Sequence, residues 1–245
     1  MAGVRVEVGG GVYWVVLSRP ERLNSLDSAT LASVEGALGE SCGRGDVAVV
    51  ALTGEGRFFS SGIDLAEVAS AAGPGEASRP FKALAGVLGA MLSCPKPVVA
   101  VLNGPAVAGG AELAVAADLV YAVRGSWLQW VEARWGLVPP VLASLSIPEQ
   151  VKARLALAAE RVSAEEALRY GIIAGVYGSV EEARGAVEAL ARLAGEAGPE
   201  ALGAILEAVR RPKRGALALA EKLVGLAESE ALIARAKAFL ERRRG

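Results

Sequence analysis

Short runs of uncharged, often β-branched residues alternate along the chain with longer segments of helical periodicity. A strand buried on both faces reads as a continuous apolar run of this kind. Strands that alternate with helices of about 10–15 residues predict an α/β core with parallel pairing. The strands are expected at 47–52, 97–102 and 119–123, and the helices at 28–41, 80–92 and 109–117.

The two ends of the chain predict different structures. Residues 4–8 alternate with period two, and three glycines lead into 12–17, so a hairpin is expected first. After Pro148 helices dominate. They are expected at 150–159, 163–170, 180–193 and in two later segments to Arg244, with only 172–176 extended. A composition shift near 195 and a break at Gly198–Pro199 divide the chain into an α/β core, 1–195, and a helical region, 196–245. Gly73–Gly75 is expected in a mobile loop.

Charge and composition exclude several classes of partner. The 26 basic residues balance 27 acidic ones, so no overall field attracts nucleic acid or an anionic membrane. No run of about 18 apolar residues predicts a membrane span, and the first ten residues do not resemble a signal peptide. The two cysteines, Cys42 and Cys94, lack a CxxC spacing and suggest no disulfide framework. We therefore expect a protein of a reducing cytoplasm.

The chain contains no histidine. Ser-His-Asp and Cys-His mechanisms and the commonest zinc sites are therefore excluded. Any proton transfer must fall to Asp, Glu, Lys, Tyr or Cys. This narrows the search for a site to three segments.

The first segment, 58–65, follows the strand expected at 47–52. Gly62 permits a positive φ and the close approach of a ligand to the backbone. Ser60 and Asp64 can satisfy local N–H groups in a tight turn. The alternative is a plain strand-to-helix connection capped by Asp64.

The second segment, 103–112, joins a buried strand to a helix that begins with Gly109 and Gly110. A helix N-terminus offers unpaired N–H donors that could hold a developing oxyanion. Glu112 lies in the first turn among apolar residues, where a carboxylate without a role is costly. The alternative is that Glu112 only stabilises its own helix and that the glycines serve packing.

The third segment, 127–140, places Glu132 among three tryptophans. Apolar surroundings raise the pKa of a carboxyl group and suit it to proton transfer near neutrality. The alternative is a structural ion pair with Arg134.

In this order, the segments resemble the enoyl-CoA hydratase/isomerase (crotonase) superfamily. Residues 17–20 and 23–26 are similar to the family's L-x-R-P and L-N-A-L opening. The resemblance continues through 59–65, 103–118 and 132–139, then Arg161–Ala167 and the closing A-F-x-E-R-R at 238–243. It covers nearly the whole chain.

The resemblance implies a core of stacked ββα turns, a helical C-terminal part that mediates trimerisation, and a homotrimer or a hexamer built as a dimer of trimers. It implies an acyl-CoA thioester substrate without a metal or a further cofactor. Ile63 and Gly109 match the residues whose backbone N–H groups hold the thioester oxygen, and Glu112 and Glu132 match the paired catalytic glutamates. The expected CoA-binding positions are Leu23, Asn24, Ser25, Leu26, Ile63, Asp64, Leu65 and Ala66, with Phe239 and Arg242 reaching a neighbouring subunit's CoA.

Two departures from the family pattern affect the substrate. A glycine-rich P-G-x-G-G-T stretch is common after the second glutamate, but here Pro139 leads into Pro140 and 141–145. The sequence therefore does not determine the length or branching of the substrate's acyl chain. The segment 60–65 is similar to dienoyl-CoA isomerases, but these place an additional acid where Pro140 stands.

Hydration of a 2-enoyl-CoA is the leading hypothesis, because both glutamates are present. Other reactions of the same family, such as Δ3-Δ2 isomerisation, decarboxylation or thioester hydrolysis, remain alternatives. A non-catalytic, RNA-binding relative is disfavoured by the balanced charge. Apolar side chains of the C-terminal region predict a subunit interface, with folding back onto the chain's own core as the alternative. They are Leu217, Leu219, Leu223, Leu226, Leu232, Ile233 and Phe239.

Overall fold

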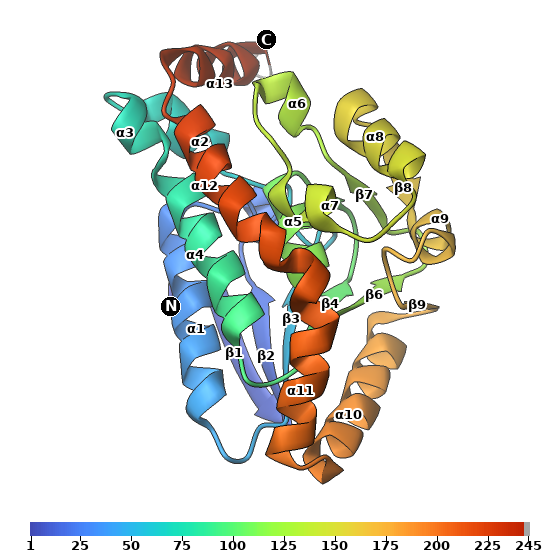
Figure 1. The fold of residues 1–245 in the computed structure, drawn as a ribbon. Helices are drawn as coiled ribbons and strands as arrows, with labels where there is room; N and C mark the ends of the chain where they lie inside the picture. Colours follow the sequence, from blue (N-terminus) through green and yellow to red (C-terminus); the bar gives the residue numbers. More distant parts are fainter. Residues whose placement is uncertain (243–245) are drawn as a thin grey trace.

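A mixed six-stranded sheet forms the centre of the molecule in the computed structural model, which describes residues 1–242 (Figure 1). Its order is β1-β2-β3-β4-β6-β9. The opening hairpin is antiparallel, and the other neighbouring pairs are parallel. The strands are β1 (Val4–Gly9), β2 (Val12–Leu17), β3 (Val49–Gly54), β4 (Val98–Leu102), β6 (Leu119–Val123) and β9 (Gly175–Tyr177). The predicted α/β core with parallel pairing is confirmed.

A second, three-stranded sheet has the order β5-β7-β8. It consists of β5 (Ala106–Val107), β7 (Trp127–Gln129) and β8 (Arg161–Ser163). Because β5 directly precedes helix α5 (Gly109–Ala116) and β7 directly precedes the Glu132 segment, this small sheet sets those two segments side by side.

The remaining helices surround the two sheets. They are α1 (Ser28–Gly43), α2 (Leu65–Ser70), α3 (Pro74–Ala77), α4 (Arg79–Ser93), α6 (Glu132–Trp135), α7 (Pro140–Ser144), α8 (Glu149–Ala158), α9 (Ala164–Arg169), α10 (Val180–Glu196), α11 (Pro199–Arg210), α12 (Gly215–Ala227) and α13 (Glu230–Arg242), with 3-10 turns η1 (Pro20–Arg22) and η2 (Arg211–Arg214). Capping residues determine where some of these helices begin. Asp27 accepts a hydrogen bond from the Thr30 N–H at the start of α1, and Ser163 and Glu166 form a capping box at the start of α9.

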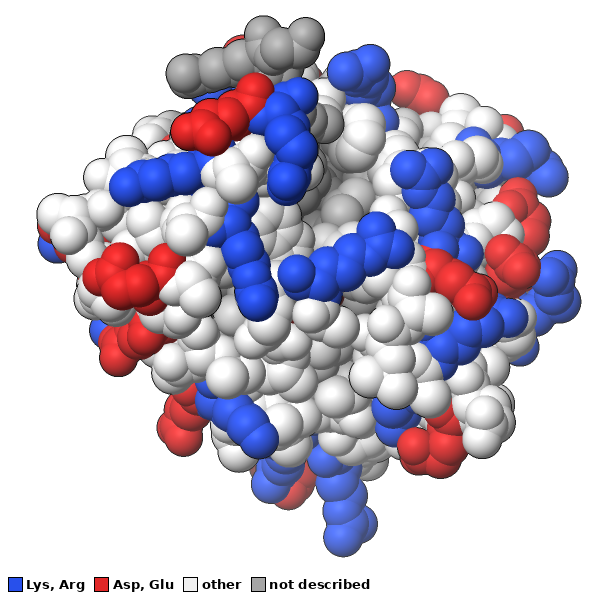
Figure 2. Space-filling view, turned by 90° about the horizontal axis from the view of Figure 1, so that it is seen from above, with Lys and Arg blue, Asp and Glu red and all other residues white. Residues whose placement is uncertain are grey.

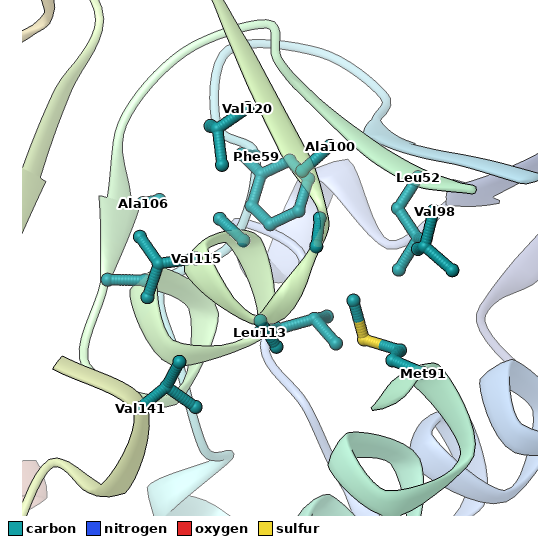
Figure 3. Packing of buried hydrophobic residues seen from close by; sticks show 14 of the residues in the cluster. Leu52, Phe59, Met91, Val98, Ala100, Ala106, Leu113, Val115, Val120 and Val141 are labelled. Carbon is teal, nitrogen blue, oxygen red and sulfur yellow. The ribbon is translucent and has the colours of Figure 1, made fainter. Parts of the chain in front are cut away.

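The two faces of the main sheet pack against different helices. The larger apolar cluster includes residues from α1, α4 and α5, and the smaller one joins the other face to α10. Helix α5 lies inside the larger cluster, with Leu113 and Val115 among apolar neighbours (Figure 3). All eight residues of α5 are buried, so Glu112 is in the interior.

Several sequence-based boundaries shift in the structure. Strand β3 begins at Val49, two residues late, because its ladder with β2 begins only where β2 itself starts. Strand β9 begins at Gly175, because the N–H groups of Ile172 and Ile173 still bond to Ala167 at the end of α9. Helix α3 begins at Pro74, within the segment expected as a loop.

The C-terminal region forms three α-helices rather than the two predicted segments. It starts after α10, with Gly198 preceding α11 as expected. Buried Arg210 binds Asp118 through two nitrogens and attaches α11 to the core. The predicted division into two domains stays a prediction, and Arg243 and Arg244 lie outside the described residues.

Part of the C-terminal apolar surface folds back onto its own chain. Leu223, Leu232 and Ile233 are buried in a cluster that α12 and α13 form with α2 and the loop after α6. Leu217 and Leu226 are still 39% and 40% exposed. The alternative reading is thus confirmed for three of these side chains, and the subunit interface stays a prediction. Within residues 1–242, no helix is both long and apolar enough to cross a bilayer.

Candidate active site

Two backbone segments come into close contact at the start of α5. Gly62 has a φ of 88°, and a Cβ there would lie 2.7 Å from the Val107 oxygen and 3.2 Å from the Gly109 nitrogen. Ala108, before α5, has a φ of 47° with a ψ of −124°, a conformation that side chains disfavour. Strained backbone of this kind is concentrated at functional sites. The contact sets Ile63 beside Gly109.

The backbone N–H groups of Ile63 and Gly109 are the oxyanion donors expected from the sequence. Within the described part of the chain, neither donates a backbone hydrogen bond. The Ile63 amide lies between Gly62, whose oxygen accepts from Leu26, and Asp64, whose N–H donates to Leu26. The Gly109 amide is one of the unpaired first-turn donors of α5. Two such donors side by side could hold an anionic oxygen.

Both oxygens of the Glu112 carboxylate accept hydrogen bonds. The indole Nε1 of Trp130 donates to Oε1 at 2.7 Å, and the N–H of Leu142 donates to the same oxygen at 3.1 Å. The N–H of Val141 donates to Oε2. Glu112 therefore caps the first turn of α7, whereas the alternative reading had it stabilise only its own helix, α5. Gly110 does serve packing, because a Cβ there would lie 2.7 Å from Ser60.

Glu132 is buried without equivalent partners. It is 5% exposed at the start of α6, and its Oε2 has no hydrogen-bond partner among the described residues. Arg134 is exposed, and the ion pairs between described residues do not include one that joins it to Glu132. The ion-pair alternative is therefore not supported.

The two carboxyl groups differ in their tendency to ionise. Burial raises the pKa of Glu112 to about 7, while its three donors oppose that rise. Burial, followed by repulsion from Glu112, raises the pKa of Glu132 well above its usual range. The donors to Glu112 favour its ionised form, whereas burial and the neighbouring Glu112 carboxyl group both act against ionisation of Glu132. Environments that separate two carboxyl pKa values in this way are typical of an acid and a base in one site.

Nearly the whole chain matches one family model. The model is described as enoyl-CoA hydratase/isomerase, and it matches residues 7–243. The chain belongs to the enoyl-CoA hydratase/isomerase family.

Curated relatives and solved structures agree with this family. The chain is 38% identical over 174 residues to a protein of Rhodobacter capsulatus named "Probable enoyl-CoA hydratase". The matched part covers 69% of this chain and 66% of the relative, so the chain spans slightly less than two thirds of that relative's length. A Bacillus subtilis protein of the same name is 32% identical, with 90% and 89% covered. The crystal structure of an enoyl-CoA hydratase/isomerase from Xanthobacter autotrophicus is 27% identical, has a TM-score of 0.85, and covers 99% of this chain and 93% of that chain. The crotonase-like fold is confirmed.

The family's expected CoA-binding stretches lie side by side. The Leu26 N–H donates to the Gly62 oxygen, and the Asp64 N–H donates back to Leu26. The polar side chains of these stretches form hydrogen bonds within the chain. Asn24, 1% exposed, donates to the oxygens of Glu55 and Phe58. Their contact with CoA stays a prediction.

Contact with CoA also stays a prediction for the other residues of the two expected CoA-binding stretches. Asp64 accepts from Ser25 and pairs with Arg19, while Ala66 is exposed on α2. Leu23 has a φ of 54°, and Leu65 is half-buried as the first residue of α2. These contacts fix the shape of the loop.

Helix α13 packs against α2 and the segment around α6 within the same chain, at the end of the molecule where α6 lies (Figure 1). The Phe239 ring meets Trp135 of α6 edge-on, with ring centroids 5.6 Å apart. Arg242 is exposed at the end of α13. The contribution of both residues to a neighbouring subunit's site stays a prediction. The adjoining face is hollowed, and several Lys and Arg side chains border the hollow (Figure 2).

The contact between Trp130 and Glu112 does not follow from the sequence. Trp130 is expected there only as part of the apolar surroundings of Glu132, whereas its ring is fully buried and its N–H donates to Glu112. The positions 112 and 130 are 18 residues apart on different elements, so no local pattern marks the pair. A buried Trp N–H usually has a partner, which was the available signal.

Proposed function

We propose that the chain is an enoyl-CoA hydratase that adds water across the C2=C3 bond of a 2-enoyl-CoA thioester. The observation that carries the proposal is the pairing of Glu112, whose carboxylate accepts three hydrogen bonds, with buried Glu132, whose Oε2 has no partner among the described residues, next to the backbone N–H groups of Ile63 and Gly109. Hydration needs both a base and an acid, and these two carboxyl groups supply them.

The proposed reaction assigns one role to each group. Three of the roughly four acceptor positions of the Glu112 carboxylate are occupied, which leaves one for a proton of the attacking water. Glu112 activates that water for attack at C3, and Glu132 gives its proton to C2. The Ile63 and Gly109 N–H groups stabilise the negative charge that develops on the thioester oxygen. Each well-placed donor contributes about 3–4 kcal/mol to the transition state.

The charge of the hollowed face is compatible with a CoA ester. The chain as a whole has a net charge of −1, yet basic side chains border the hollow in Figure 2. The phosphates of CoA are anionic and would be attracted there. We include no metal or further cofactor, because the proposed chemistry uses only carboxyl groups and backbone amides.

Incubation with crotonyl-CoA tests the proposal. Hydration removes the conjugated double bond, so the absorbance of the enoyl thioester falls. A panel of straight, branched and dicarboxylic enoyl-CoAs then defines the acyl chain. Stable absorbance with every member of the panel would contradict the assignment.

A double-bond isomerase is the second candidate. The observation that favours it is that three hydrogen bonds already engage the Glu112 carboxylate, because an isomerase needs only one carboxyl group to move a proton. A peroxisomal Δ3,5-Δ2,4-dienoyl-CoA isomerase of Arabidopsis thaliana is 28% identical, with 81% of this chain and 77% of that one covered. With a 3-enoyl-CoA, an isomerase would produce the conjugated thioester, and absorbance would rise.

A further inference from the structure

The two cysteines of the chain lie in contact, although 52 residues separate them. Cys42 is in the last turn of α1, and Cys94 directly follows α4. Their sulfur atoms are 2.8 Å apart. A disulfide has an S–S distance of about 2 Å, so closing the bond requires the sulfurs to approach by roughly 0.8 Å.

The surrounding backbone is fixed in a way that keeps the sulfurs together. The Lys96 ammonium donates to the oxygens of Ser41 and Arg44, on either side of Cys42. The buried guanidinium of Arg210 donates to the oxygens of Cys94 and Lys96. Lys96 therefore holds the end of α1 to the segment that carries Cys94, and Arg210 fixes that segment in place, independently of the thiols.

The two thiols differ in access to solvent. Cys94 is 3% exposed, whereas Cys42 is half-buried. Burial raises the pKa of the Cys94 thiol to about 12. Cys42 is therefore the sulfur that an external reagent reaches first, and Cys94 is placed to act second.

We propose that Cys42 and Cys94 are a disulfide-forming pair that links the end of α1 to the end of α4 and stabilises the fold. The oxidant is a low-molecular-weight disulfide such as oxidised glutathione. The Cys42 thiolate attacks it, forms a mixed disulfide and releases one glutathione thiol. Cys94 then loses its proton and attacks the Cys42 sulfur, which expels the second glutathione. Two protein thiols lose two electrons and two protons, and one external disulfide becomes two thiols.

The pair lies away from the proposed active site. Ser28, at the other end of α1, binds Glu67 of α2, next to the Ile63 segment. At 1.5 Å per residue, α1 separates Cys42 from that end by about 20 Å. The proposal therefore does not depend on the function of the site.

Oxidation of the wild-type protein tests the proposal without any variant. Reduced protein is incubated with oxidised glutathione, and thiols are titrated after denaturation, together with the intact mass. We expect both thiols to disappear, with a mass loss of two hydrogens and no glutathione adduct. The melting temperature of the oxidised form should exceed that of the reduced form by about 5–15 °C.

Two matched variants identify the order of the steps. Cys94→Ser should accumulate one glutathione adduct at Cys42, and Cys42→Ser should stay unmodified. In both, the melting temperature should no longer rise on oxidation. Wild-type protein that keeps two free thiols or a lasting glutathione adduct would refute the bond, and an unchanged melting temperature would refute its stabilising role.

Discussion

At the scale of single residues, Glu112 and Glu132 share an apolar interior but differ in the partners of their oxygens. Three donors surround the Glu112 carboxylate, while Oε2 of Glu132 has no partner among the described residues. A buried carboxyl group with few donors resists ionisation. The difference in partners, rather than in burial, thus separates the proposed roles of the two groups.

The raised pKa of Glu132 predicts a pH-dependent gain in stability for Glu132→Gln. An unfolded Glu ionises near pH 4.3, whereas the folded carboxyl keeps its proton to much higher pH. Its contribution to stability is therefore fully present below about pH 4.3 and is lost as pH rises towards the folded pKa. The neutral amide loses nothing over this range.

We expect the stability of Glu132→Gln relative to wild type to increase as pH rises above about 5, by at most about 1.4 kcal/mol per pH unit. Urea denaturation at a series of pH values measures this difference. If the difference stayed constant with pH, Glu132 would not be held protonated in the folded protein.

The Trp130 indole predicts a shift in the pH dependence of activity. Trp130→Phe keeps an aromatic ring but removes the donor to Oε1 of Glu112. The ionised form of Glu112 then becomes less stable, so its pKa rises above about 7. The acidic limb of kcat/KM should move up by about one pH unit.

Trp14→Phe is the matched control, because Trp14 is also buried but lies in the cluster on the α10 side of the sheet. It should leave the acidic limb in place. Identical pH profiles for Trp130→Phe and wild type would mean that the indole does not influence the base.

At the scale of elements, the site depends on the close approach of the loop before α2 to the start of α5. Gly62 permits this approach, because its backbone lies against Val107 and Gly109. The approach also sets the two proposed oxyanion donors side by side. A side chain at position 62 would separate the two segments.

Gly62→Ala should therefore lower kcat by at least about 10²-fold, because it displaces a donor of the proposed oxyanion hole. Gly125→Ala is a matched control: its φ is 87°, close to the 88° of Gly62, but its Cβ would meet nothing within 4 Å. Both variants carry the same backbone strain, of about 1 kcal/mol or more. Steady-state kinetics of the two folded variants separates the effect of backbone strain from the effect of displacing the donor. Equal activities of Gly62→Ala and Gly125→Ala would contradict the assignment of the oxyanion donors.

The sequence allowed most elements to be predicted, because the central strands are continuous apolar runs. It failed where the boundary depends on a partner: β3 starts opposite β2, and β9 starts only after Ala174 bonds to Val120. The paired glutamates were found by residue type and by resemblance. The different hydrogen-bonding of the two carboxyl groups could not be predicted, because the donors to Glu112 from Trp130 and α7 come from distant parts of the chain.

At the scale of the whole molecule, the C-terminal helices pack against α2 and the loop after α6 of their own chain but leave apolar surface exposed. Leu217 and Leu226 of α12 and Ile205 of α11 are each about two fifths exposed or more. Such side chains are commonly covered by another subunit. We therefore expect a homotrimer or a hexamer in solution.

Light scattering at micromolar concentration measures this assembly directly. The mass should be about three or six times the 25.0 kDa of one chain. A mass near 25.0 kDa would mean that the exposed apolar side chains are not an interface and that no neighbour contributes to the site.

The mass of the product formed from crotonyl-CoA tests the central claim most directly. Hydration predicts a product heavier by one water, formed by wild-type protein and at a rate lowered at least about 10²-fold by Glu132→Gln, which cannot donate the proton. CoA-ester binding by the variant should stay within a few-fold of wild type. A product of unchanged mass, or a Glu132→Gln variant that keeps more than about a tenth of the rate, would contradict hydration by the Glu112–Glu132 pair.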